Sequence, residues 1–280
     1  MVTDESLNMV IDLVTMRTGI IPRSSHREGI RSYLSGKMDA LGIISVKEYA
    51  DRLRMDKSLL MELINESTVN ETYFFREEKQ FAFVRSKILP EWIRRHGSLP
   101  IKIWSAACSY GEEAYSLALL AKDSGARAHI TASDINTVVL SHCAAGVFNA
   151  SSLRGGDGVS FQRLLLPYRT NEAKIVFPSD IRNYIMTRQI NLAEIDNPIS
   201  ESILPKMQNI VFLRNVFIYF SQKLRARILK VIADRCMAED AVLFVSMSEI
   251  AQIDGSIMPA SLEKVCDGNV FYFKKKKTEV

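Results

Sequence analysis

The residues at 104–115 combine side-chain types and a spacing that suit binding chemistry. The stretch continues an alternating run at 101–104, passes through Ser, Ala and Gly residues, and opens a helical pattern with Glu112 and Glu113. Such a change predicts a strand that enters a tight turn before a helix. A turn of this kind is typical of a nucleotide-type cofactor cradle. An ordinary turn without a ligand is the plainer interpretation.

The two glutamates narrow the class of ligand that the turn would suit. The first turn of a helix presents unpaired N–H groups and a partial positive charge, which ordinarily favour a phosphate. Glu112 and Glu113 would repel a phosphate but would favour a ligand that carries sulfonium and ammonium groups. S-adenosylmethionine is such a ligand. Favourable charges at a helix start are the alternative interpretation of the pair.

A further acidic residue ends the next predicted strand, at 129–135. Asp134 lies roughly 20 residues beyond the glycine of the turn, where an acid reaches ribose hydroxyls in a doubly wound sheet. The turn, the acid pair and Asp134 together favour a cofactor site over a simple turn.

Composition places the chain among ordinary globular proteins. Its 280 residues, 47% hydrophobic and 24% charged, suffice for one large domain and one small one. No stretch reaches the roughly 18 apolar residues of a membrane helix, and the acidic N-terminus is unlike a signal peptide. These features predict a cytoplasmic protein without membrane insertion, and we expect a monomer.

Charge and cysteine usage exclude two further classes of site. The net charge of +4 comes partly from the lysines at 274–277, and no basic face with interleaved aromatic residues is evident, so we expect no nucleic-acid partner. The four cysteines are widely scattered and lack metal-ligand spacing. We therefore expect neither a metal site nor disulfides.

Strand and helix patterns alternate from about residue 100 to the end, which predicts an α/β fold with a parallel sheet covered by helices. The predicted strands are 101–107, 129–135, 185–191, 208–213, 241–247 and 269–274, and the predicted helices begin near Glu112, Thr137 and Ser221.

The chain divides into three parts by pattern. Residues 1–66 read as a small helical domain, 67–99 as a linker and helix, and 100–280 as the α/β domain. A glycine-rich interruption at about 149–181 predicts an inserted, hairpin-rich β-subdomain.

Four separated segments share one family pattern: 70–77 (Asn-Glu-Thr-Tyr-Phe-Phe-Arg-Glu), 105–118, 191–192 (Asn-Leu) and 212–220 (Phe-Leu-Arg-Asn-Val-Phe-Ile-Tyr-Phe). Together they resemble the CheR family of chemotaxis receptor glutamate methyltransferases, and the likeness covers nearly the whole chain. The resemblance implies a Rossmann-like S-adenosylmethionine-dependent methyltransferase sheet, a small all-helical N-terminal domain and an inserted β-subdomain.

The resemblance also implies roles for individual residues. Tyr219 matches a tyrosine close to the transferred methyl group, and Arg76 matches a position that contacts the cofactor or organises the site. Both are expected to be catalytic, and no metal is implied. The residues matched to cofactor contacts are Asn70, Thr72, Arg76, Glu113, Asp134, Asn191, Leu192, Arg214 and Asn215. Plainer interpretations stay open: a surface ion pair for Arg76, a turn residue for Asn191 and a buried strand-end residue for Tyr219.

The activity implied by the resemblance is transfer of a methyl group from S-adenosylmethionine to glutamate γ-carboxylates on the cytoplasmic helices of a methyl-accepting chemoreceptor. The products would be glutamyl methyl esters, formed in chemotactic adaptation, and S-adenosylhomocysteine. The alternative is an S-adenosylmethionine-binding regulatory protein without transferase activity, because Tyr110 replaces a smaller family residue and would crowd the methionine moiety. A methyltransferase for nucleic acids or small molecules is a further alternative.

Two surfaces are expected to meet the receptor. The helical domain carries Arg17, Arg23, Arg27, Arg31 and Lys37, which predict either a solvated helix face or a face that docks an acidic partner. The insertion is implied to bind a receptor C-terminal peptide by strand addition.

Overall fold

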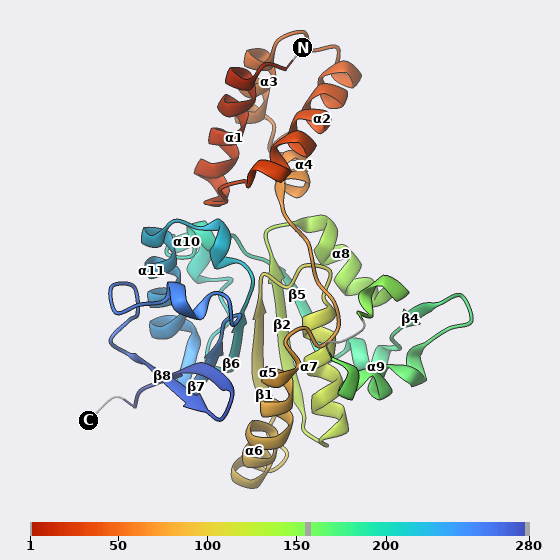
Figure 1. The fold of residues 1–280 in the computed structure, drawn as a ribbon, viewed down its shortest axis with the longest axis vertical. Coiled ribbons are helices and arrows are strands. Elements are labelled where there is room, and N and C mark those ends of the chain that lie inside the picture. The colour runs from red at the N-terminus through yellow and green to blue at the C-terminus, as the bar shows by residue number, and fades with distance from the viewer. Residues whose placement is uncertain (1, 155–157, 278–280) are drawn as a thin grey trace.

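The computed structural model describes residues 2–154 and 158–277 (Figure 1). Four helices form a separate layer at the N-terminal end of an elongated molecule, and a sheet with helices on both faces forms the larger part. Across the described residues, no helix is both long enough and apolar enough to cross a bilayer.

The N-terminal layer consists of α1 (Asp4–Thr18), α2 (Ser24–Leu41), α3 (Val46–Met55) and α4 (Lys57–Ser67). Apolar residues recur at helical spacing and meet in one core, which includes Leu7, Val10, Val14, Leu34, Tyr49 and Leu63. Side-chain oxygens of Thr3, Ser45 and Asp56 accept N–H bonds at the starts of α1, α3 and α4. These caps satisfy backbone donors that would otherwise lack partners.

The larger part is organised by a seven-stranded sheet with the order β5-β2-β1-β6-β7-β9-β8. The strands are β1 (Ile101–Ala106), β2 (Ala128–Asp134), β5 (Ile185–Gln189), β6 (Gln208–Leu213), β7 (Met237–Phe244), β8 (Leu262–Asp267) and β9 (Val270–Lys275). The first five pair in parallel, and β9 runs antiparallel to β7 and β8. The prediction of an α/β fold with a Rossmann-like sheet is confirmed.

Strand β8 was not predicted, for a physical reason. It lies at the edge of the sheet, and most of its residues are exposed or half-buried, with Leu262 alone among them fully buried. An edge strand of this kind has little apolar alternation for a pattern search to detect.

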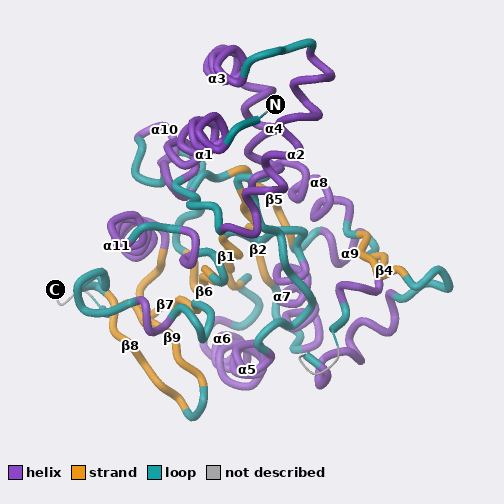
Figure 2. The backbone as a smooth tube through the Cα atoms, turned by 45° about the horizontal axis from the view of Figure 1, so that its top comes forward, coloured by secondary structure: helices purple, strands orange, loops and turns teal. Residues whose placement is uncertain are grey.

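Helices cover both faces of the sheet, as Figure 2 shows from a second direction. One face is covered by α5 (Glu78–Phe83), α6 (Leu89–His96), α7 (Glu112–Asp123) and α8 (Thr137–Ala145), and the other by α11 (Gln222–Val231). The central strand β1 contributes to both cores, because Ile103 packs into one and the next residue, Trp104, into the other. Two short helices, α9 (Ser179–Arg182) and α10 (Pro198–Glu201), complete the set.

The insertion differs from the hairpin-rich subdomain that the sequence predicted. It contains one short antiparallel ribbon, β3 (Val147–Asn149) with β4 (Lys174–Val176), and the longest regular element between them is a 3-10 helix at Val159–Tyr168. Phe161 and Leu165 of this helix are buried, and the Phe161 ring stacks on Phe75 with 4.9 Å between ring centres. Because this part of the insertion forms a helix with buried side chains, few of its residues are available for strands. Gly155 and Gly156 lie outside the described residues.

The turn between β1 and α7 takes an unusual backbone path. Ala107 and Ser109 have φ values of 61° and 52°, and Gly111 has a φ of 106°. A Cβ at Gly111 would lie 2.5 Å from the Sγ atom of Cys143 on α8. Only glycine therefore combines this φ with the close approach of α8.

Replacing Gly111 with Ala is expected to lower the free energy of unfolding by about 2–3 kcal/mol, because the new Cβ adds backbone strain and a clash with Cys143. Urea denaturation measures the change. Gly36→Ala is the matched control: Gly36 lies inside α2, where an added Cβ would meet no other atom within 4 Å. That change should raise stability by about 0.5–1 kcal/mol. Equal changes in the free energy of unfolding for both variants would contradict the proposal that only glycine fits at position 111.

Candidate functional site

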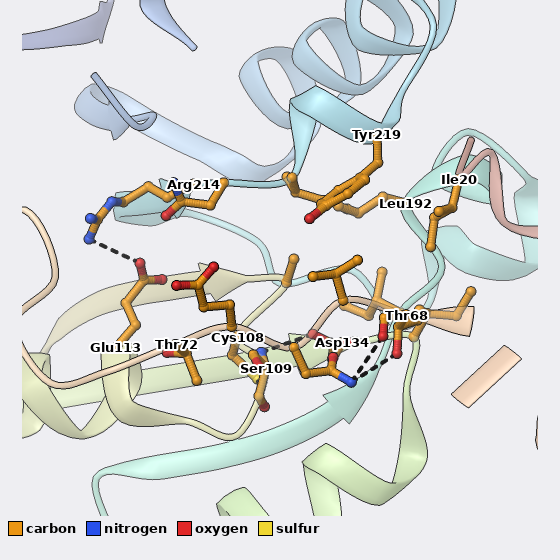
Figure 3. Close-up of a pocket in the computed structure, with 18 of the residues that line it drawn as sticks. Ile20, Thr68, Thr72, Cys108, Ser109, Glu113, Asp134, Leu192, Arg214 and Tyr219 are labelled. Carbon is orange, nitrogen blue, oxygen red and sulfur yellow. Dashed lines mark hydrogen bonds and ion pairs between the residues drawn. The ribbon is translucent and has the colours of Figure 1, made fainter. Parts of the chain in front are cut away.

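A cavity opens at the carboxyl ends of β1, β2 and β6, where it also meets the N-terminal layer (Figure 3). It contains about 950 Å³ of empty space, part of it open to solvent. Ligands of open parallel sheets bind at this edge. All the site residues predicted from the sequence line this cavity: Asn70, Thr72, Arg76, Glu113, Asp134, Asn191, Leu192, Arg214, Asn215 and Tyr219.

One end of the cavity is built around a buried ion pair. Nη1 of Arg214 lies 3.2 Å from Oε2 of Glu113, and the two side chains are 2% and 15% exposed. The Arg214 guanidinium lies 5.5 Å from the ring centres of both Phe81 and Phe212. Because the rings keep water away, the attraction between the two charges is stronger than on the surface. The pair joins the end of β6 to the first turn of α7.

The Glu113 carboxylate is held in one orientation. Its Oε1 accepts a hydrogen bond of 2.6 Å from the Ser105 hydroxyl. Burial raises the pKa of Glu113, and the nearby Arg214 cation and the Ser105 hydrogen bond oppose that rise. An oriented carboxylate in a poorly solvated position is well suited to bind a cationic group of a ligand.

Glu112 has a different role from its neighbour. Its side chain is buried away from the cavity lining, and its Oε1 accepts a hydrogen bond of 2.7 Å from the Ser152 hydroxyl. Burial raises the pKa of Glu112 as well. The acid pair that suggested a cation site thus divides into one cavity residue, Glu113, and one residue that packs against the insertion.

Asp134 lies at the end of β2 and is fixed by backbone donors. Its Oδ2 accepts the N–H of Ser109 at 2.9 Å, and its Oδ1 accepts the N–H of Asn136 at 3.0 Å. Burial raises the pKa of Asp134, and these N–H donors oppose the rise. The carboxylate oxygens keep further lone pairs for hydroxyl groups of a ligand. The turn after β1 therefore orients the acid at the end of β2.

The N-terminal layer supplies one wall of the cavity, through Thr18 and Ile20. The Asn191 side-chain amide donates to the Arg17 carbonyl at 2.7 Å, and the N–H of Ile21 donates to the Tyr219 carbonyl at 2.9 Å. These bonds fix the segment after α1 against the rim of the cavity. Figure 3 shows Ile20 and Leu192 at the end of the cavity opposite Glu113 and Arg214.

Comparisons with known proteins agree with this geometry. Residues 70–260 match the family described as CheR methyltransferase, SAM binding domain. The chain belongs to the CheR methyltransferase family. It is 28% identical to the chemotaxis protein methyltransferase of Borreliella burgdorferi, over 94% of this chain and 95% of that one. It is 32% identical to chemotaxis protein methyltransferase 1 of Pseudomonas aeruginosa, over 75% of this chain and 78% of that one.

The CheR family match identifies S-adenosylmethionine as the cofactor, and the chemistry of the cavity fits this molecule. Glu113 and Asp134 provide buried carboxylates at two places in the cavity, which suits a ligand that carries cationic groups and ribose hydroxyls but no phosphate. Within residues 2–154 and 158–277, no group of His, Cys, Asp and Glu side chains could hold a metal ion.

Tyr110 does not crowd the cavity in this CheR family member. It is not part of the cavity lining, and its ring packs edge-to-face against His142 with 5.0 Å between ring centres. The expectation that Tyr110 obstructs the methionine end of the cofactor is therefore wrong. The reason is the backbone path of the turn, which directs this side chain towards α8.

Glu249 is a site-forming residue that the sequence analysis missed. Its side chain is fully buried, and its carboxylate accepts backbone N–H groups of Asn215 and Phe217, each at 2.7 Å. Longer bonds come from the N–H groups of Ile218, at 3.4 Å, and Ser246, at 3.2 Å. Glu249 thus holds the loop that carries Arg214 and Tyr219. Its position shortly after a predicted strand was the available signal.

Replacing Glu249 with Ala is expected to lower the free energy of unfolding by about 2–4 kcal/mol, because buried N–H groups of the loop lose their acceptor. Urea denaturation measures this loss, and calorimetric titration should show weaker S-adenosylmethionine binding. Glu263→Ala removes an exposed glutamate from β8 and serves as the control, with an expected change within about 0.5 kcal/mol. Wild-type stability for the Glu249 variant would refute the anchoring role.

Proposed function

We propose that this protein transfers a methyl group from S-adenosylmethionine to the γ-carboxylate of glutamates on the cytoplasmic helices of a chemoreceptor. The observation that carries the proposal is the charge arrangement of the cavity. Carboxylates of Glu113 and Asp134 lie among its lining residues, and Arg76 and Tyr219 line it too. The interior suits a cationic cofactor, and Arg76 suits an anionic acceptor.

The residues at the two ends of the cavity would bind different parts of the cofactor. Glu113, oriented by Arg214, would bind the ammonium group of the methionine part, and Asp134 would bind the ribose hydroxyls. Asn191, Leu192 and the N-terminal wall would enclose the adenine. Asn70, Thr72 and Asn215 also line the cavity and would supply further polar contacts. When bound, S-adenosylmethionine supplies an electrophilic methyl group on a sulfonium.

Glutamate needs little activation as the acceptor. Its ordinary pKa of about 4.3 leaves the side chain ionised at neutral pH, so no general base is required. The protein's contribution is to hold the carboxylate oxygen in line with the methyl group and to exclude water. Fixed geometry of this kind contributes on the order of 7–11 kcal/mol to lowering a barrier.

Arg76 and Tyr219 are the residues that would orient the acceptor. Both line the cavity, and the Arg76 guanidinium is held by a hydrogen bond of 2.9 Å to the Glu71 carbonyl. Burial raises the pKa of Tyr219, so its phenol stays protonated and can donate a hydrogen bond. Arg76 would attract the carboxylate, and Tyr219 would position it near the methyl group.

Each methyl ester removes one negative charge from an acidic helix surface of the receptor, which weakens repulsion between its helices. This charge change is a physical basis for chemotactic adaptation. The reaction would take place in the cytoplasm, with the protein acting as a monomer.

The insertion is the part that would bind a receptor C-terminal peptide. Val147 and Val176 face each other across the β3–β4 ribbon and are 37% and 41% exposed. The outer edge of β3 has no strand partner within the described part of the chain. An added strand would cover that edge and these side chains.

The activity is tested by incubating the protein with methyl-labelled S-adenosylmethionine and a chemoreceptor cytoplasmic fragment. Methyl esters release labelled methanol in mild base, whereas methylated amines do not. We expect label on the fragment that base releases, and loss of most of this transfer in Arg76→Ala. Cofactor binding without any transfer would favour the alternative of a regulatory protein, and stimulation by RNA or DNA instead of the fragment would favour a nucleic-acid substrate.

Cofactor affinity is expected to depend on pH through the buried carboxylates. Burial raises the pKa of Glu113 above its ordinary 4.5 and that of Asp134 above 3.8, so both groups lose their charge at a higher pH than exposed carboxyls do. Affinity for S-adenosylmethionine should therefore fall on acidification at a higher pH than the one at which exposed carboxyls titrate. Calorimetric titrations at decreasing pH measure this fall, and Asp134→Asn should bind more weakly with a flatter pH profile. An unchanged affinity in Asp134→Asn would contradict the proposed contact between Asp134 and the ribose hydroxyls.

A further inference from the structure

Arg154 reaches from the insertion to the segment that carries Arg76, the residue proposed to attract the acceptor carboxylate. Its Nη1 atom lies 2.7 Å from Oε1 of Glu71, and its guanidinium carbon lies 4.8 Å from the centre of the Tyr73 ring. Glu71 and Tyr73 both line the cavity, whereas Arg154 does not. An arginine outside the cavity thus holds two side chains of the cavity lining.

The Glu71 carboxylate acts on both residues that are proposed to orient the acceptor. The hydrogen bond from Arg154 lowers the pKa of Glu71, burial opposes this shift, and the Arg76 charge lowers the pKa further. Burial raises the pKa of Tyr219, and the negative charge of Glu71 adds to that rise. Glu71 is therefore an anion of the protein itself that, once released from Arg154, would compete with a substrate carboxylate for Arg76.

The acids near Arg76 are paired with other arginines. The Arg76 charge interacts electrostatically with two carboxylates, those of Glu71 and Glu113. Glu71 is paired with Arg154 at 2.7 Å, and Glu113 is paired with Arg214 at 3.2 Å. Over residues 2–154 and 158–277, Arg76 itself forms no ion pair. This division of partners leaves the Arg76 guanidinium available to a carboxylate of the substrate.

The ion pair between the insertion and Glu71 contributes little to the attachment of the insertion. Its two side chains are 50% and 53% exposed, and ion pairs with such exposure add little to stability. Other contacts already join the insertion to the same segment. The N–H of Phe74 donates to the Ser152 carbonyl at 3.0 Å. The ring of Phe161 stacks on Phe75 with 4.9 Å between ring centres. Attachment alone therefore does not account for the pair.

We propose that Arg154 is a positioning residue, which holds the Glu71 carboxylate away from Arg76 so that this guanidinium stays available to the acceptor. The inference rests on the proposed function. Without Arg154, the Glu71 side chain turns to Arg76, because the two residues lie five positions apart and are already bonded through the Glu71 carbonyl. The apparent affinity for the receptor then falls to the fraction of molecules in which Arg76 is unpaired.

The test uses the full-length protein and a chemoreceptor cytoplasmic fragment, and it measures steady-state methylation. Arg154→Met removes the charge and keeps an unbranched side chain. Glu71→Gln removes the competing charge, and a double variant combines the two changes. Arg85→Met is the matched control, because Arg85 also pairs with a carboxylate, that of Asp123 at 2.8 Å, and lies 6.0 Å from the Phe161 ring centre. Arg85 does not line the cavity.

We expect Arg154→Met to raise KM for the fragment about three- to tenfold, with kcat within about twofold, since Glu71 would occupy Arg76 in about two thirds to nine tenths of the molecules. The double variant should have the same KM as Glu71→Gln within about twofold, because no competing charge remains. Arg85→Met should behave as wild type. Calorimetric titration should show wild-type affinity for S-adenosylmethionine in Arg154→Met.

Three results would overturn the inference while normal methylation by the wild type leaves the proposed function intact. The first is an unchanged KM in Arg154→Met. The second is an equal rise in KM when Arg154 is replaced in the Glu71→Gln background, because the effect would then come from lost packing. The third is a parallel loss of cofactor affinity, which would show that the pair supports the cofactor site instead. Absence of methylation by the wild type would overturn the proposed function and this inference together.

Discussion

The buried charge of Arg214 is the constraint on which the cavity depends. A buried guanidinium beside two phenylalanine rings would be very unfavourable without partners, and breaking one side of a buried pair typically costs about 3–5 kcal/mol. Glu113 supplies the principal partner, Glu77 lies 3.6 Å away, and the Arg76 carbonyl accepts a further hydrogen bond. Because these groups come from β6, α7 and the linker, satisfying one charge fixes three segments around the cavity.

The same principle operates at the ends of two other strands of the sheet, β2 and β7. Asp134 at the end of β2 and Glu249 after β7 each accept backbone N–H groups from a loop that lines the cavity. In both cases a buried carboxylate replaces the regular hydrogen bonds that an irregular loop lacks. The loops are thereby held in place without ligand, which reduces the entropy that cofactor binding must otherwise overcome. Asp134 keeps an additional role because it faces the cavity, whereas Glu249 is enclosed by backbone donors.

The sequence was most informative where local pattern and chemistry coincide. The strand-turn-helix pattern around Gly111 and the acid at the end of β2 were sufficient to predict the sheet edge and two cavity carboxylates, and the family resemblance added eight further residues that line the cavity. Three features depended on contacts between distant segments. The Glu112 side chain contacts Ser152 in the insertion, Tyr110 packs against His142 on α8, and Phe161 stacks on Phe75 from within a 3-10 helix. Such choices are set by tertiary packing, which residue pattern alone does not encode.

The central claim is that the buried carboxylates of this cavity recognise a cationic cofactor. Calorimetric titration of S-adenosylmethionine into Glu113→Gln at neutral pH tests it most directly, because this change removes the charge and keeps the shape. Provided that the variant still unfolds cooperatively, the account predicts at least about tenfold weaker binding than wild type, equivalent to roughly 1.4 kcal/mol. Binding as tight as that of the wild type would contradict it.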